Sequence, residues 1–365
     1  MNRTKLRVAT PLALAAVAAL TLSACGAGNE ADATDDATES TLSGTLNGAG
    51  ASSQEAAVAS WKQGFQTANP DVTVNYDPAG SGAGREQFIA GGTDFAGSDA
   101  YLDDEELTAA EERCGSDVIE VPTYVSPIAV IYNLPGVDGL QLSADTLGKI
   151  FAGKLTTWDD AAIKADNPDA TLPSSKITPV HRSDDSGTTE NFTAYMAAAA
   201  PQSWTEGEVE TWPIKGGEGA QGTSGVVATV QGGEGTIGYA DASQAGSLGV
   251  ASLKVGEEYV GPSPEAAAKI LEASKQKEGR GDTHLVMDID HTTTESGVYP
   301  AVLLSYQIAC LQYDDEAKAD LVKGWLSYVA SSDGQQAAAE GAGSAPLTSA
   351  LEERIADIVD GISAK

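Results

Sequence analysis

Short runs rich in β-branched residues alternate along the chain with longer runs in which apolar residues recur at helical spacing. This alternation is typical of α/β proteins, because strands form a sheet and the helices between them cover its faces. The pattern predicts strands at Val72–Tyr76, Thr93–Ser98, Ile177–Arg182 and Thr236–Ala240. It predicts helices near Arg85–Ala90, Asp103–Arg113, Ser186–Ala199, Thr223–Gln231, Pro264–Gln276, Asp315–Ala330 and Ser349–Val359.

Two apolar stretches, Val118–Tyr132 and Val298–Leu311, are longer than ordinary strands. About 320 residues follow the N-terminal segment, which is too many for one small core and suits two lobes of ordinary domain size. The two stretches are therefore candidates for passages of the chain between lobes. Buried strands are the alternative, and hydrophobic periodicity alone does not decide between them.

Residues 1–24 have the pattern of a secretion signal. A basic segment containing Arg3, Lys5 and Arg7 precedes an apolar run, Val8–Leu20, that is too short for an ordinary membrane span. The next segment, LSAC ending at Cys25, is similar to the lipobox of bacterial lipoproteins, in which the cysteine becomes the lipidated first residue. We therefore expect a lipid anchor at Cys25; a chance cysteine beside an ordinary secretion signal is the alternative.

Residues 25–43 are rich in Ala, Asp, Thr, Glu and Gly. Such a composition cannot bury enough apolar surface to offset the entropy lost on ordering. We expect a disordered tether between the anchor and the folded part.

The chain is strongly acidic, with 21 Lys and Arg against 53 Asp and Glu and a formal net charge of −32. Loss of the leader, which contains three basic residues and no acidic one, would make it more negative still. Nucleic acid is not expected as a partner. An anion would have to be held by donors and dipoles at contact range, because the overall field repels it.

Cys114 and Cys310 are the cysteines that remain after lipidation. In an exported protein two such cysteines are more often bonded to each other than free, so we expect a disulfide. The three histidines, His181, His284 and His291, lack the spacing of metal ligands, and the sequence has no CxxC motif. We expect no metal site and no cofactor.

The segment His181–Thr189, HRSDDSGTT, lies between a predicted strand and a predicted helix. Free backbone N–H groups at the start of a helix, beside small hydroxyl side chains, suit a tetrahedral oxyanion. Arg182 can add a forked, charged donor, and Asp184 could hold its guanidinium in place. An ordinary helix cap beside a surface ion pair is the alternative.

Three other segments have the same small, hydroxyl-rich or Gly-rich character: Gly48–Ser53 (GAGASS), Gly80–Gly84 (GSGAG) and Asp94–Ala100 (DFAGSDA). Each alone is a weak signal, because a Gly-rich turn is more often only a turn. Gly48–Ser53 lacks the third glycine of a dinucleotide fingerprint, and the sequence contains no GxxxxGK[ST] motif. Nucleotide binding therefore has little support.

Taken in this order, the four segments closely resemble those of the phosphate-binding proteins of the phosphate-specific ABC transport system. The similarity extends over most of the chain after the leader, because Gly148–Lys154, Trp158–Asp160 and Thr236–Tyr239 also look like signatures of that family. The resemblance implies a two-lobed periplasmic-binding-protein fold of class II type. Each lobe would be a mixed sheet flanked by helices, and the ligand would lie in the cleft between them.

In that fold, the first lobe is built from both chain ends. The resemblance implies lobe 1 at residues 44–124 and 290–365 and lobe 2 at residues 125–289. Lobe 1 would bind phosphate through Ser52, the N–H of Ser53 and the hydroxyl of Ser81. Asp99 would accept the proton that phosphate itself carries.

From lobe 2, Arg182 would be the single charged donor, oriented by Asp184. Further hydroxyls and amides would come from Ser186, Gly187 and Thr188. The sequence departs from the family pattern at Asp185, an additional carboxylate where a small neutral residue is frequent. We expect Asp185 to face solvent, because an inward carboxylate would weaken anion binding.

Phosphate near neutral pH keeps at least one proton, whereas sulfate is fully ionised and can only accept hydrogen bonds. An ionised Asp99 would therefore select phosphate, since sulfate would place acceptor against acceptor and charge against charge. Arsenate shares the protonation of phosphate and would not be excluded sharply. Closure of the lobes over the ion would be favoured by its contacts with both.

The expected function is thus capture of inorganic phosphate outside the cytoplasm, by a monomer anchored to the cell membrane through Cys25, for delivery to the permease of an ABC importer. Three alternatives stay open: a binding protein for another oxyanion such as arsenate or sulfate, a phosphate sensor or scavenger of the same fold, and a hydrolase that uses Ser186 with His181 as its base. The hydrolase is disfavoured, because the sequence has no GxSxG elbow and no metal set, so no enzyme activity is expected.

Overall fold

The computed structural model describes residues 42–365, which belong to one compact unit. The predicted signal peptide, the predicted lipidation site Cys25 and the tether up to residue 41 lie outside the described residues. Leu42, which the sequence assigned to the tether, is half-buried against the hydrophobic core. No helix within residues 42–365 is long and apolar enough to cross a membrane.

A mixed nine-stranded sheet runs through the unit in the order β2-β1-β3-β14-β4-β8-β6-β7, and β9 pairs with β4. Its strands are β1 Gly44–Gly50, β2 Val72–Asp77, β3 Phe95–Ser98, β4 Val118–Asn133, β6 Thr178–Arg182, β7 Glu218–Ala220, β8 Thr236–Asp241, β9 Gly249–Val250 and β14 Val302–Cys310. The smaller sheets are formed by β5 Gln141–Leu142, β10 Ser252–Val255 and β11 Glu258–Val260; by β12 Lys275–Gln276 and β13 Met287–Asp288; and by β15 Gln312–Tyr313 and β16 Ser363–Ala364.

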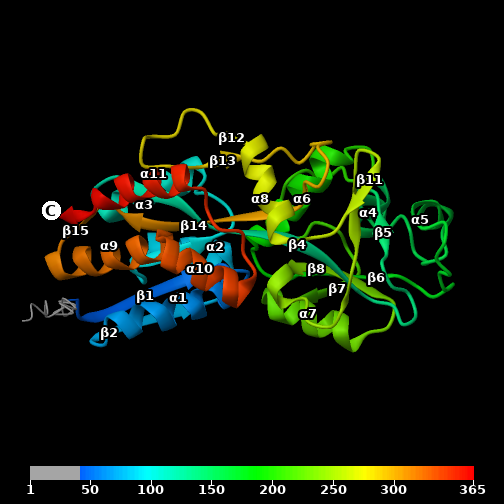
Figure 1. Ribbon diagram of the computed structural model, residues 1–365, viewed down its shortest axis with the longest axis horizontal. Helices are drawn as coiled ribbons and strands as arrows, with labels where there is room; N and C mark the ends of the chain where they lie inside the picture. Colours follow the sequence, from blue (N-terminus) through cyan, green and yellow to red (C-terminus); the bar gives the residue numbers. More distant parts are fainter. Residues whose placement is uncertain (1–41) are drawn as a thin grey trace, which may run out of the picture. The chain divides into compact units, whose positions relative to one another are not determined.

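Helices flank the large sheet. They are α1 Glu55–Ala68, α2 Ser81–Ile89, α3 Asp104–Cys114, α4 Ala144–Phe151, α5 Ala161–Asp166, α6 Gly187–Ala199, α7 Gly222–Gly232, α8 Pro264–Ala273, α9 Glu316–Ala330, α10 Ser332–Ala342 and α11 Ser349–Asp360. In Figure 1, one group of elements gathers around β1, β2 and β14 and contains α1, α9 and α10, while another contains β6 to β8 and α4 to α7. The α/β prediction is confirmed.

Strands β4 and β14 are the two long apolar stretches of the sequence. They form an antiparallel pair, and every residue of them except Asn133 is buried. β4 pairs with β14 as far as Pro127 and with β8 from Ile128 onward. Both stretches are therefore buried strands, and β4 also carries the chain from the strands around β14 to those around β8.

Most helices begin at a residue whose side chain accepts a hydrogen bond from a free N–H of the first turn. Asp103 does so for α3 and forms a capping box with Glu106, and Gly115 ends that helix in the left-handed region at φ 59°. Three of the described helices, α1, α2 and α7, begin without such a side-chain cap. All three meet at the site described below.

A disulfide links Cys114, at the end of α3, to Cys310, at the end of β14. The two Cα atoms are 5.5 Å apart although the residues are 196 positions apart in the chain. The link expected from the sequence is thus present, and it ties an early segment to a late one. Such a link removes conformational freedom mainly from the unfolded chain.

Candidate anion-binding site

The four predicted segments come together where the two groups of strands meet. Each predicted ligand lies at or just beyond the carboxyl end of a parallel strand: Arg182 is the last residue of β6, and the others lie in a connection or in the first turn of the next helix. This is where α/β folds bind ligands. The predicted residues with side chains are almost fully buried, none of them more than 4% exposed: Ser52, Ser53, Ser81, Asp99, Arg182, Ser186 and Thr188. Gly187 is buried as well. Their roles in binding remain predictions.

Asp99 lies at the centre of the site and accepts hydrogen bonds from three hydroxyl groups. Ser53 Oγ contacts Oδ1 at 2.7 Å and Oδ2 at 2.8 Å, and Thr188 Oγ1 contacts Oδ2 at 3.0 Å. The third donor is Ser305 Oγ, 2.6 Å from Oδ1. Burial raises the pKa of Asp99, and these hydrogen bonds, with the charge of Arg182, oppose that rise.

The guanidinium of Arg182 is held by Asp184 in a fork. Arg182 Nε donates to Asp184 Oδ1 at 2.8 Å, and Nη2 donates to Oδ2. Asp184 Oδ1 also accepts the backbone N–H of Gly222 at 3.1 Å. Burial acts to raise the pKa of Asp184, but the contacts with Arg182 and Gly222 outweigh it, so the pKa lies below its usual value. Asp184 therefore remains a charged anchor for the only predicted cationic ligand.

The turns that carry these residues approach one another so closely that a side chain at Gly80 or Gly187 would not fit. Gly80 has a φ of 110°, and a Cβ there would lie 2.8 Å from Asp184 Oδ2. A Cβ on Gly187 would lie 2.7 Å from both Asp99 Cβ and Ser81 Oγ. These glycines allow segments from the two groups of strands to meet. The site is closed in this conformation.

The start of α7 is a component that the sequence motifs did not single out. Ser52 Oγ accepts the N–H of Thr223 at 3.0 Å and lies 3.1 Å from Thr223 Oγ1. Three uncapped helix starts, those of α1, α2 and α7, thus contribute to one site together with α6. The helix dipoles at these starts favour negative charge. A signal was present in the small residues Gly222 and Thr223 at the start of the helix predicted at Thr223–Gln231.

Asp185 is exposed and accepts a hydrogen bond from the Thr211 hydroxyl, so the expectation that it faces solvent is confirmed. The hydrolase alternative gains no support from the geometry. His181 stacks on the Trp212 ring, with centroids 5.0 Å apart, while Ser186 Oγ caps α6 by accepting the N–H of Thr189. The described residues also contain no cluster of His, Cys, Asp and Glu that could hold a metal ion.

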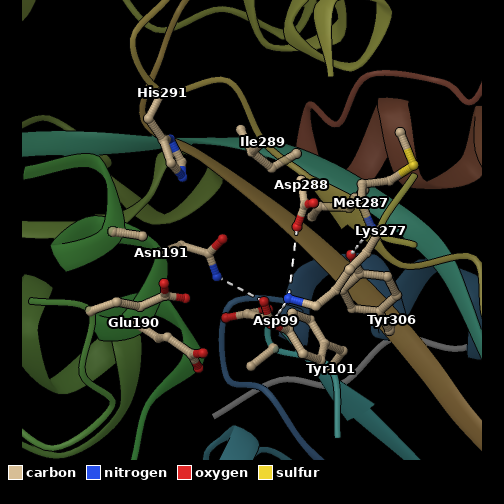
Figure 2. Close-up of a pocket in the computed structure, with 14 residues that line it drawn as sticks. Asp99, Tyr101, Glu190, Asn191, Lys277, Met287, Asp288, Ile289, His291 and Tyr306 are labelled. Atoms are coloured by element: carbon tan, nitrogen blue, oxygen red, sulfur yellow. Dashed lines mark hydrogen bonds and ion pairs between the residues drawn. The ribbon is translucent and has the colours of Figure 1, made fainter. Parts of the chain in front are cut away.

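A separate cavity of about 190 Å³ opens on the other side of Asp99. Figure 2 shows its wall formed by Asp99 and Tyr101, by Glu190 and Asn191 of α6, and by residues around the β12–β13 pair such as Lys277. Of the predicted ligands only Asp99 lines it. The cavity is thus a neighbour of the anion site and not the site itself.

Residues 35–333 match the family model described as "PBP superfamily domain". The sequence is 35% identical to phosphate-binding protein PstS 3 of Mycobacterium tuberculosis over 370 residues, which cover 98% of this chain and 99% of that protein. It is 33% identical to phosphate-binding protein PstS of Xylella fastidiosa over 78% of this chain and 77% of that protein. The chain therefore belongs to the PBP superfamily and, within it, to the family of these phosphate-binding proteins.

Solved structures agree with the fold. One is a high-affinity periplasmic phosphate-binding protein, PfluDING, bound with phosphate, which matches with a TM-score of 0.70 at 22% identity over 86% of this chain and 93% of that chain. Another is a phosphate-binding protein from Stenotrophomonas maltophilia, with a TM-score of 0.64 at 19% identity and the same coverages. The two-lobed fold expected from the sequence is confirmed.

Proposed function

We propose that this protein captures inorganic phosphate between its two lobes and delivers it to an ABC importer. The observation that carries the proposal is a buried carboxylate, Asp99, set among hydroxyl donors, uncapped helix starts and one fixed guanidinium. A pocket of donors alone would suit any oxyanion. The added acceptor suits an ion that brings its own proton, as phosphate does. The relatives named as phosphate-binding proteins support the same ligand.

The proposed ligands are those expected from the sequence, with Thr223 added because it contacts Ser52 across the site. Lobe 1 comprises residues 44–124 and 290–365, and lobe 2 comprises residues 125–289. The protein acts outside the cytoplasm as a monomer held to the membrane by a lipid on Cys25. It binds phosphate without turning over phosphate esters.

Calorimetric titration of the protein without its leader tests this function. Phosphate should saturate one site and sulfate should release no heat, because Asp99 repels an ion without a proton. Asp99→Asn should lose most of that discrimination and bind sulfate measurably, since the amide offers a donor; a change of about 1.4 kcal/mol corresponds to tenfold in affinity. Asp185→Asn, which removes an exposed carboxylate from the same connection, is the matched control and should behave like the parent.

Saturation of the parent protein by sulfate would contradict the selective role of Asp99. Absence of phosphate binding would contradict the proposed function as a whole. Arsenate is expected to bind, because it carries the same proton.

A further inference from the structure

Ser305 lies within the buried apolar strand β14 and contacts the anion site from behind. Its side chain is fully buried, and its hydroxyl lies 2.6 Å from Asp99 Oδ1. The sheet register explains this contact. β14 is antiparallel to β3, and Tyr306 lies opposite Ser98. The next pair in that register brings Ser305 opposite Asp99, immediately beyond the end of β3.

The β4–β14 pair contains a β-bulge beside Ser305. Across the β4–β14 pair, Ser305 lies opposite Tyr124 but Tyr306 lies opposite Pro122, so that Thr123 is an additional residue on β4. Bulges re-aim side chains and are frequent beside functional sites. The carbonyl of Thr123 accepts a hydrogen bond from Gln335 Nε2 at 3.0 Å, which holds the bulge in place.

The three hydroxyl donors to Asp99 have different positions relative to the proposed phosphate. Ser53 and Thr188 belong to the first turns of α1 and α6, or immediately precede them, where the ion would contact them. Ser305 belongs to neither turn, and within residues 42–365 Asp99 is the one hydrogen-bond partner found for its hydroxyl. When phosphate binds, the hydroxyls of Ser53 and Thr188 can both turn to the ion and free Oδ2, whereas Ser305 donates to Oδ1 and can keep that contact.

We propose that Ser305 is a positioning residue for phosphate selectivity: its hydroxyl holds Asp99 Oδ1 and keeps the carboxylate ionised, so that Oδ2 faces the proton of the bound phosphate. This inference rests on the proposed function and deepens it. It assigns a selectivity role to a residue 206 positions from Asp99 in the chain and outside the four ligand segments.

Loss of the Ser305 hydroxyl should change the protonation of Asp99. Burial raises the pKa of Asp99, and the Ser305 hydrogen bond is the foremost of the contacts that lower it. Without it the carboxyl is protonated at a higher pH. A protonated Asp99 offers an O–H donor, which suits sulfate and no longer accepts the proton of phosphate. Discrimination between the two ions should therefore fail at a higher pH in the variant than in the parent.

Other ionisable groups face Asp99 from the surrounding elements, and a pH titration must separate their effects. Arg182 approaches from β6, and Tyr76 approaches from β2 with a pKa raised well above its usual value by burial and by the charge of Asp99. The adjoining cavity adds Tyr101, Glu190, Glu208, Lys277, Asp288, His291 and Tyr306. All of them are retained when Ser305 is replaced, so the difference between variant and parent isolates the hydroxyl.

The test measures phosphate and sulfate affinities by calorimetry from about pH 5 to about pH 8 for the parent, Ser305→Ala and Ser305→Cys. Ser305→Ala should weaken phosphate binding at neutral pH by roughly tenfold or more, as expected for a hydrogen bond to a charged group. Sulfate binding should appear at a higher pH than in the parent. Ser305→Cys keeps the shape of the side chain with a weaker donor. Its phosphate affinity and the pH at which it binds sulfate should change in the same direction as in Ser305→Ala, but by less.

The matched control is Thr123→Val at the same bulge, because the Thr123 hydroxyl is buried and has no hydrogen-bond partner in the part of the chain that the structure describes. It should leave the pH profile of both ions unchanged. If Ser305→Ala does not fold, as judged by circular dichroism, the pH dependence of ion binding in Ser305→Cys is compared with that of the parent instead. If the parent binds phosphate and the Ser305 variants bind sulfate with the same pH dependence as the parent, this inference is wrong but the proposed function stands. A parent that does not bind phosphate would overturn the proposed function.

Discussion

A carboxylate among the ligands of an anion site costs affinity for most anions, so its presence at Asp99 needs a compensating purpose. Asp99 is 3% exposed, and three hydroxyls donate to it. Phosphate can make the same kind of contact because it carries a proton. In the proposed site, selectivity would rest on this one side chain, while Arg182 and the helix starts would hold the charge.

Only part of this site could be predicted at the level of single residues. Ser52, Asp99 and Arg182 lie in short segments whose composition and order are informative. Ser305 is one serine in an apolar strand, and no local pattern marks it. Its contact with Asp99 depends on the register between β14 and β3, which comes from packing over a long separation in the chain.

Glu190 of α6 is a half-buried carboxyl whose protonation is measurable. Burial and the charge of Glu210 raise the pKa of Glu190 from 4.5 to about 9. The folded state therefore holds a proton that the unfolded state releases, and the stability this contributes is present below about pH 4.5 and is lost as the pH rises toward 9. Glu190→Gln should lose less thermal stability than the parent between about pH 5 and about pH 9.

Melting curves followed by circular dichroism at several pH values check this prediction. Glu112→Gln, at an exposed position of α3, is the control and should follow the parent. If the melting temperature falls with pH equally steeply in Glu190→Gln and in the parent, Glu190 is ionised in the folded protein.

At the scale of elements, Arg85 of α2 joins the two proposed lobes. Its Nη1 and Nη2 donate to Glu210 at 2.8 Å and 2.7 Å, and its Nε donates to Glu106 of α3 at 2.9 Å. Glu210 lies in the connection between α6 and β7. The proposed division places this connection in lobe 2 and α2 in lobe 1, so the bidentate pair would form only when those lobes are closed.

Glu210→Gln should weaken phosphate binding by roughly tenfold, about 1.4 kcal/mol, because it removes a charge-assisted contact of the closed state. The loss should arise from faster dissociation, which stopped-flow tryptophan fluorescence measures. Glu206→Gln changes an exposed glutamate of the same connection and should not alter the rate. A dissociation rate equal to that of the parent would show that Arg85 and Glu210 do not stabilise closure.

Many of the longer helices and strands could be predicted from the sequence because each has a local periodicity. The helices predicted at Asp103–Arg113 and Ser349–Val359 differ from α3 and α11 by one residue at their ends. Helix α10 was not predicted, because its buried positions include Gly334, Gln335 and two alanines, which give no clear apolar face. The path of β4 between the two groups of strands also required the structure, since all its residues except Asn133 are buried and no periodicity marks the crossing.

At the scale of the molecule, a chain of net charge −32 binds an anion only if the site acts at short range. Charges on the surface are screened beyond about 8 Å in physiological salt, whereas the uncapped starts of α1, α2 and α7 act at contact distance. In the proposed function, closure would bury these groups together with Arg182 and exclude water, which would strengthen their interaction with the ion.

The most direct test of the central claim is a crystal structure of the protein with bound phosphate. The account predicts one tetrahedral ion within hydrogen-bond distance of Arg182, Ser52 and Asp99 Oδ2, with Ser305 still bonded to Oδ1. Phosphate found in the adjoining cavity beside Lys277 and His291, with Arg182 and Ser52 not in contact with it, would contradict the account.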